Sequence, residues 1–214
     1  MSIGRLYLVT DRSLTLGRPL EQIVARAVQG GVSAVQLREK EAATRSFVEA
    51  ARQMKALLAP YGVPLLINDR VDVALAVGAA GVHIGQEDLP YPLARRLLGP
   101  QAIIGLSVET EAQVVAAEAY DVAYLGVSPI FPTPTKKDTR GSWGLTGLAR
   151  VRRLSRHSLV AIGGLNVGNA AAAITAGADS IAVVSAICSA EDPREAAAEL
   201  SAAVCEALTS PRKE

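Results

Sequence analysis

Short apolar runs alternate along the chain with longer segments whose apolar residues recur every three or four positions. The short runs have the length and composition of buried strands, and the longer segments have the spacing of helices with one buried face. The predicted strands are Leu6–Thr10, Ala34–Arg38, Pro64–Ile67, Gly81–Ile84, Ala102–Ser107, Val122–Gly126, Leu159–Ile162 and Ser180–Val184. The predicted helices are Leu20–Gln29, Thr44–Leu58, Val71–Val77, Tyr91–Leu98, Glu111–Ala119, Leu145–Leu154, Val167–Ala176 and Pro193–Leu208.

Eight strand–helix units predict an α/β fold, a single-domain (β/α)8 TIM barrel covering residues 1–214. Near-continuous apolar strands support a parallel sheet that is buried on both faces. Glycines that separate a helical segment from the next strand, such as Gly78 and Gly177, are typical of helix ends in the left-handed conformation. A doubly wound open sheet is the alternative, but no Gly-x-Gly-x-x-Gly turn follows the first predicted strand.

Composition and charge narrow the class of protein. Hydrophobic residues make up 50% of the chain, and 22 basic side chains nearly balance 21 acidic ones. Without a strong net field or a basic block, a nucleic-acid or membrane partner is not expected. No apolar run is long enough to span a bilayer, and the N-terminal residues lack a signal-peptide pattern, so a cytoplasmic protein is predicted. The apolar outer helices are compatible with a homodimer.

Cysteine and histidine are scarce. Cys188 and Cys205 lie far apart without metal-ligand spacing and are interpreted as reduced packing thiols. With only His83 and His157, a zinc enzyme is not expected. His83 falls inside a predicted strand and is expected to be a packed core residue, whereas His157 is expected at the surface.

Polar side chains follow the predicted strands at their carboxyl ends, where barrels of this kind place their active sites. On the second strand, Gln36, Arg38 and Lys40 share one face, and three such donors can hold a heterocycle edge and a diphosphate. Other strands lead into further polar groups, namely Asp11-Arg12, Asn68-Asp69-Arg70, Gly85-Gln86-Glu87-Asp88 and Ser107.

Residues 129–138 directly follow the sixth predicted strand. Three prolines exclude a helix or an inner strand, because proline removes a backbone donor and restricts its predecessor. Two hydroxyls and two ammonium groups then crowd together, at Thr133, Thr135, Lys136 and Lys137. This pattern predicts a pre-shaped loop that binds an anion such as phosphate. A solvated basic loop without a ligand is the alternative.

Two further sites are predicted at neighbouring strand ends. Asp69 and Asp88 can face one ion, and two carboxylates with phosphate oxygens and water make a suitable Mg²⁺ site. The alternative for each is helix capping or a surface ion pair. Gly163-Gly164 and Val184-Ser185 end the last two strands, where backbone N–H groups often bind phosphate, although a tight turn also explains two glycines. Asn166 is the expected N-cap of the helix that follows.

These sites together place a metal-bound diphosphate opposite a monophosphate. Two phosphorylated ligands without an obvious general base indicate group transfer with diphosphate as the leaving group. Trp143 lies just beyond the basic loop. Two interpretations stay open for it: its indole covers a bound ligand, or it packs against the rest of the protein.

In six ordered motifs the chain resembles the thiamine phosphate synthase family, and the similarity covers nearly its whole length. The motifs lie in Gln36–Lys40, Asn68–Asp72, Gly85–Pro90, Gly126–Lys137, Ala161–Gly164 and Val183–Ile187. The resemblance implies a transferase of thiamine biosynthesis. It would join 4-amino-2-methyl-5-pyrimidinylmethyl diphosphate to a thiazole phosphate and give thiamine phosphate and diphosphate. The family's reaction is thought to begin with loss of diphosphate, which leaves a pyrimidinylmethyl cation for the thiazole nitrogen to capture.

The resemblance also assigns roles by position. It implies that Asp69 and Asp88 hold magnesium, while Arg38, Lys40, Ser107 and Lys136 form the catalytic set. The pyrimidine diphosphate would be bound by Gln36, Arg38, Lys40, Asn68 and Ser107. Thr133, Thr135 and Lys136 would span the two ligands, and the thiazole phosphate would be bound by Gly164, Val184 and Ser185.

One position departs from the family pattern. Two residues beyond the serine of the fifth strand the family commonly has histidine, and here that residue is Glu109. A thiazole tautomerase of the same fold is the alternative function, but it often carries that histidine and tends to lack the paired aspartates. A non-catalytic thiamine phosphate-binding protein is a further alternative, which the intact aspartate pair disfavours. The stretch from Thr139 to Gly144 matches the family less well.

Overall fold

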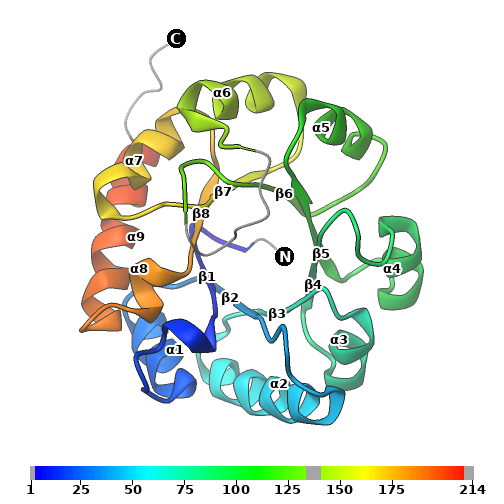
Figure 1. The fold of residues 1–214 in the computed structure, drawn as a ribbon, viewed down its shortest axis with the longest axis vertical. Coiled ribbons are helices and arrows are strands. Elements are labelled where there is room, and N and C mark those ends of the chain that lie inside the picture. The colour runs from blue at the N-terminus through cyan, green and yellow to red at the C-terminus, as the bar shows by residue number, and fades with distance from the viewer. Residues whose placement is uncertain (1–2, 134–140, 210–214) are drawn as a thin grey trace.

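The computed structural model describes residues 3–133 and 141–209, which form a closed barrel of eight parallel strands joined in sequence order. Figure 1 looks into the barrel, with the strands at the centre and the helices around them. The strands are β1 (Leu6–Val9), β2 (Ala34–Leu37), β3 (Leu65–Asn68), β4 (Gly81–Ile84), β5 (Ile103–Val108), β6 (Tyr124–Val127), β7 (Leu159–Ile162) and β8 (Ser180–Val183). The predicted TIM barrel is confirmed.

All eight predicted helices are present, and all of their bounds agree within two residues. They are α1 (Leu20–Gln29), α2 (Thr44–Leu58), α3 (Val71–Val77), α4 (Tyr91–Leu98), α5 (Glu111–Ala117), α6 (Gly144–Leu154), α7 (Val167–Thr175) and α9 (Pro193–Thr209). A short helix that the sequence did not predict, α8 (Ser185–Cys188), directly follows β8. The Asn166 side chain accepts a hydrogen bond from Gly168 N–H and caps α7, as predicted.

The core has two parts because successive strand residues face opposite sides of the sheet. The larger part lies between the strands and the helices and contains residues such as Leu8, Leu37 and Ile67. The smaller part fills the inside of the barrel and contains Tyr7 and Tyr124. The barrel is therefore a packed core whose open end lies at the carboxyl ends of the strands.

The barrel closes where its first and last strands meet. β1 pairs with β8 in parallel, with Leu8 opposite Val183. α9 packs against both α1 and α7, and Figure 1 shows it between them on the outside of the barrel. Within the described residues, no helix combines the length and the apolar character needed to cross a bilayer.

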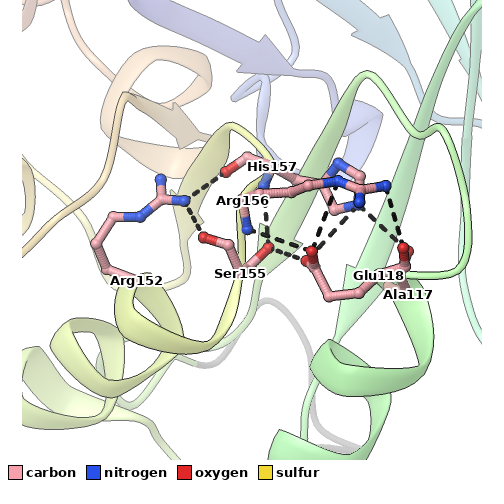
Figure 2. A network of polar contacts seen from close by, with 6 residues as sticks. All are labelled: Ala117, Glu118, Arg152, Ser155, Arg156 and His157. Carbon is pink, nitrogen blue, oxygen red and sulfur yellow. Dashed lines mark hydrogen bonds and ion pairs between the residues drawn. The ribbon is translucent and has the colours of Figure 1, made fainter.

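A polar network joins α5 to the turn between α6 and β7, at the opposite end of the barrel from the strands' carboxyl ends (Figure 2). Glu118 accepts hydrogen bonds from Ser155 Oγ at 2.5 Å and from the N–H of Arg156 at 3.4 Å. His157 is only 8% exposed, and its Nε2 lies 3.2 Å from the carbonyl oxygen of Ala117. The expectation that His157 lies at the surface is therefore wrong, because this network satisfies a buried imidazole.

The two cysteines are free, with Cys188 buried and Cys205 partly buried. Burial raises the pKa of the Cys188 thiol and is the largest of the effects on that pKa. Both observations agree with the predicted reduced thiols.

Candidate active site

A cavity of about 640 Å³ opens at the carboxyl ends of the strands. Its volume falls in the usual range for a small-molecule site. Of the thirteen residues predicted for the site, the structure brings eleven to this cavity: Gln36, Arg38, Lys40, Asn68, Asp69, Asp88, Ser107, Thr133, Gly164, Val184 and Ser185. The other two, Thr135 and Lys136, lie outside the described residues, as does Lys137.

The two described cations of the site are held by carboxylates. Arg38 Nη1 lies 2.8 Å from Asp11 Oδ2, and this pair is largely shielded from solvent. Lys40 Nζ lies 3.0 Å from Asp69 Oδ2. Both contacts orient positive charge along one wall of the cavity, where it can attract an anionic ligand.

Asp69 and Asp88 lie beside one another in the cavity wall. Asp88 Oδ2 accepts a 2.6 Å hydrogen bond from the N–H of Gly85. Burial raises the pKa of Asp88, the Gly85 N–H opposes that shift, and the neighbouring Asp69 carboxylate raises it further. Asp69 has a positive φ of 62°, a conformation that aspartate tolerates better than most side chains. A cation between the two carboxylates would relieve their repulsion.

The described residues contain no cluster of three or more histidine, cysteine or acidic side chains placed to hold a metal ion. The carboxylate pair alone nevertheless fits Mg²⁺, which is commonly bound by one or two carboxylates together with water and substrate phosphates. Their oxygen donors and shared negative charge match a hard divalent cation.

The Gly163-Gly164 turn packs tightly against the loop after β6. A Cβ at Gly163 would lie 2.6 Å from Pro129 Cβ, and one at Gly164 would lie 2.8 Å from Phe131 Cβ. Both glycines also have positive φ. The N–H of Phe131 donates to the Gly163 carbonyl oxygen at 3.0 Å. Glycine is thus required here for close approach, which brings the described part of the proline-rich loop to the rim of the cavity.

The floor of the cavity is polar in a way that the sequence did not predict. His83, expected to be a packed core residue, lines the cavity, and its Nε2 lies 2.8 Å from Ser107 Oγ. Its Nδ1 lies 2.9 Å from the hydroxyl of Tyr124. The sequence does contain an indication of these ring contacts. Gly105 lies in β5 and Gly126 in β6, and glycine inside a strand often marks the close approach of another group.

The profile described as thiamine monophosphate synthase matches residues 6–187.

The chain belongs to the thiamine monophosphate synthase family.

Curated relatives agree along most of their lengths. The thiamine-phosphate synthase of Albidiferax ferrireducens is 59% identical over 196 residues, which cover 92% of this chain and 90% of the relative. That of Vibrio parahaemolyticus is 50% identical over 197 residues, which cover 92% and 96%. These homologues support a thiamine-phosphate synthase function and, with it, a transferase.

Solved structures agree with the family and the fold. Thiamine phosphate pyrophosphorylase from Pyrococcus furiosus superposes with a TM-score of 0.87 at 41% identity, covering 95% of this chain and 96% of that one. A 3-hexulose-6-phosphate synthase superposes with a TM-score of 0.69 at 17% identity, covering 94% and 99%, and shows the fold alone.

Glu109 and Trp143, which the resemblance to the family leaves without a role, both have defined surroundings in the structure. Glu109 lines the cavity, and its N–H donates a 2.7 Å hydrogen bond to Gln113 Oε1. Trp143 packs against the core, beside Gly147, and is the N-cap residue that precedes α6. Its indole Nε1 is buried without a hydrogen-bond partner among the described residues. The structure thus favours packing for Trp143 over capping a ligand in this cavity, which it does not line.

Proposed function

We propose that this chain is a thiamine phosphate synthase that joins 4-amino-2-methyl-5-pyrimidinylmethyl diphosphate to a thiazole ethyl phosphate. The products are thiamine phosphate and diphosphate. The observation that carries the proposal is one cavity in which Arg38 and Lys40 lie beside the carboxylate pair Asp69 and Asp88. That arrangement suits a metal-bound diphosphate leaving group, and the close homologues support the same activity.

The pyrimidine diphosphate is assigned to the wall formed by β2 and β3. Arg38 and Lys40 bind its diphosphate, since guanidinium and ammonium groups make charge-assisted hydrogen bonds to phosphate oxygens. Gln36 and Asn68 bind the same ligand through their amide groups. Ser107 contacts it from β5.

Mg²⁺ is assigned to Asp69 and Asp88. When bound, the ion supplies Lewis-acid stabilisation of charge on the diphosphate oxygens. The environment of Asp88 supports this assignment, because burial and the neighbouring Asp69 carboxylate both raise the pKa of Asp88, and a bound cation would oppose that rise.

The thiazole phosphate is assigned to the opposite side of the cavity. Gly164 follows β7, and Val184 and Ser185 follow β8. The backbone N–H groups of these residues can bind a phosphate. Thr133 lines the same cavity and, with Thr135 and Lys136 beyond the described residues, would lie between the two ligands.

The proposed reaction depends on stabilisation of charge by the protein and does not need a protein nucleophile. As the family's reaction is understood, the C–O bond to diphosphate breaks first and its electron pair leaves with the diphosphate. Arg38, Lys40 and Lys136 stabilise that developing negative charge. The amino group of the pyrimidine stabilises the resulting cation. The thiazole nitrogen then forms the new C–N bond, so the step needs no protein base.

An assay with both substrates, with and without magnesium, tests the proposal by mass detection of thiamine phosphate. Product that forms only with magnesium supports the transferase and the metal site. An Asp69→Asn, Asp88→Asn double variant as active as the wild type would reject the metal ligands. Asp72→Asn is the matched control, because Asp72 is an exposed residue of α3 that pairs with Arg70 and does not line the cavity.

The thiazole tautomerase alternative is tested in the same assay. Isomerisation of a thiazole phosphate without any pyrimidine diphosphate would favour it. The presence of Glu109 in place of the family's frequent histidine argues against it. A homodimer and a cytoplasmic location stay predictions.

A further inference from the structure

Five side chains from five strands form a continuous chain of hydrogen bonds across the inside of the barrel. Gln36 Nε2 donates to the hydroxyl of Tyr7 at 2.7 Å, and that hydroxyl lies 3.0 Å from the hydroxyl of Tyr124. The Tyr124 hydroxyl lies 2.9 Å from His83 Nδ1, and His83 Nε2 lies 2.8 Å from Ser107 Oγ. These hydrogen bonds therefore link Gln36 on β2 to Ser107 on β5, two cavity residues that are both assigned to the pyrimidine diphosphate.

The proton count along this chain fixes its direction. Each hydroxyl has one proton to donate, and a neutral imidazole has one N–H. Among the described residues, the hydroxyl of Tyr7 hydrogen-bonds only to Gln36 and Tyr124. Because it accepts from the Gln36 amide, it must donate its own proton to Tyr124. Tyr124 then donates to His83 Nδ1.

The same direction continues to the cavity. With Nδ1 acting as an acceptor, the imidazole carries its proton on Nε2 and donates it to Ser107 Oγ. The hydroxyl proton of Ser107 then points away from the ring and toward the cavity that Ser107 lines. Gln86 holds the same residue from its other side, since its Nε2 donates to the Ser107 carbonyl oxygen at 2.7 Å.

Burial keeps both phenols in the chain protonated. Tyr7 and Tyr124 are each 1% exposed. For each residue, burial is the largest influence and raises the pKa of the phenol. Each hydroxyl therefore has the single proton that the counting requires.

Two glycines make room for the rings in this chain. A Cβ at Gly105 would overlap the phenol ring of Tyr124, which pairs with it in register across β5 and β6. A Cβ at Gly126 would lie 2.9 Å from His83 Cε1. The rings of His83 and Tyr124 stack at 5.6 Å with an interplanar angle of 20°. The interior of the barrel is thus shaped around these two rings.

We propose that the two tyrosines and His83 are positioning residues that fix the Ser107 hydroxyl as a hydrogen-bond donor into the cavity. This inference rests on the proposed function, in which Ser107 contacts the pyrimidine diphosphate. It requires the substrate atom facing Ser107 to carry a lone pair on oxygen or nitrogen. The reversed chain, in which Ser107 donates to His83, would instead make the imidazole a proton acceptor for the serine.

Nitrogen NMR of the imidazoles in the full-length protein, at neutral pH and without substrates, distinguishes the two directions. We expect His83 to show a pyridine-like Nδ1 and a protonated Nε2. A protonated Nδ1, or a doubly protonated ring, would overturn the proposal. The protein has two histidines, so the signals that are absent from the spectrum of a His83→Gln variant belong to His83. The decisive signals come from the wild-type spectrum, so this test does not depend on whether a variant protein folds.

A double-mutant cycle tests whether the chain acts through Ser107. Tyr124→Phe should lower kcat/KM by roughly five- to tenfold in the wild type, the usual worth of one buried hydrogen bond. In a Ser107→Ala background, the same substitution should change kcat/KM by less than about twofold, since the serine is no longer there to be oriented. Equal losses in both backgrounds would show a merely structural role.

Tyr91→Phe is the matched control for the cycle. It removes a tyrosine hydroxyl that donates to the Asp121 carbonyl oxygen at 2.5 Å, on α4 and away from the cavity. We expect kcat/KM of this variant to equal that of the wild type. If the wild type forms no thiamine phosphate, the proposed function fails, and the NMR experiment still decides the direction of the chain.

Discussion

Lys40 Nζ lies 3.0 Å from Asp69 Oδ2, so a cation assigned to diphosphate contacts a carboxylate assigned to magnesium. The two ligands of the site therefore share one ion pair. Magnesium would take the place of Lys40 as the partner of Asp69, and diphosphate would take the place of Asp69 as the partner of Lys40. Both side chains would then keep a partner of opposite charge. We therefore expect binding of the metal to strengthen binding of the anion.

Replacement of Lys40 tests the role assigned to its ammonium group. Lys40→Gln should reduce kcat roughly 100-fold, because one preorganised donor to the developing negative charge is lost. Steady-state kinetics with both substrates measures the effect. Lys55→Gln is the control, since Lys55 Nζ donates to the Val77 carbonyl oxygen on the outside of the barrel. Wild-type kcat in the Lys40 variant would contradict the assigned role.

Magnesium should stabilise the folded protein. In the presence of inorganic diphosphate, magnesium at about 100 times its dissociation constant should add about 2.7 kcal/mol to the unfolding free energy. The rise in thermal midpoint should disappear in the Asp69→Asn, Asp88→Asn double variant and persist in Asp72→Asn. An undiminished rise in the double variant would place the metal elsewhere.

Gly126→Ala should push His83 out of its position. The added Cβ would lie 2.9 Å from His83 Cε1, and overpacking of this kind costs about 1–3 kcal/mol. Denaturant unfolding measures the stability loss, and kinetics should show reduced kcat/KM. In a His83→Ala background the same substitution should cost less, because the clashing ring is gone. An equal cost in both backgrounds would contradict this explanation.

The network around Glu118 should make stability depend on acid pH. Burial acts to raise the pKa of Glu118, but the Ser155 hydrogen bond, the Arg156 N–H and the nearby charges of His157 and Arg156 outweigh it and lower the pKa. The stabilisation is therefore complete above the ordinary value of 4.5 and is lost as the pH falls through the lower folded-state pKa.

Glu118→Gln measures that contribution. It should cost about 0.5–1.5 kcal/mol of unfolding free energy at neutral pH, because glutamine keeps one acceptor oxygen but loses the carboxylate charge and the second acceptor that Ser155 and Arg156 share. The difference from wild type should shrink at acid pH, where the wild-type carboxylate is itself protonated. Glu111→Gln, which breaks the exposed pair with Arg150, should have little effect. A cost that does not change with pH would rule out the carboxylate charge as its origin.

Local pattern was enough to predict the fold. Apolar periodicity defines the strands and the helix bounds, and Asn166 is identifiable as a cap because capping depends on residues close in sequence. The site was predictable to the extent that polar residues stand at the carboxyl ends of strands, as Asp69 does just after β3 and Ser107 does near the end of β5. The positions of Thr135 and Lys136 stay predictions.

Contacts between distant segments were not predictable from the sequence. The burial of His157 depends on a carboxylate and a carbonyl group from α5, and the polar role of His83 depends on its neighbours across the barrel. The pairing of Arg38 with Asp11 likewise joins different strand ends. Such contacts are set by strand register, which periodicity alone does not give.

The pairing of β1 with β8 also has a consequence for how the protein is made. During synthesis, β1 leaves the ribosome long before β8, so one edge of the growing sheet must wait for its partner. An exposed strand edge of that kind invites pairing with other chains. The nascent protein is therefore most exposed to aggregation until its eighth strand emerges, and chaperone binding should be strongest during that interval.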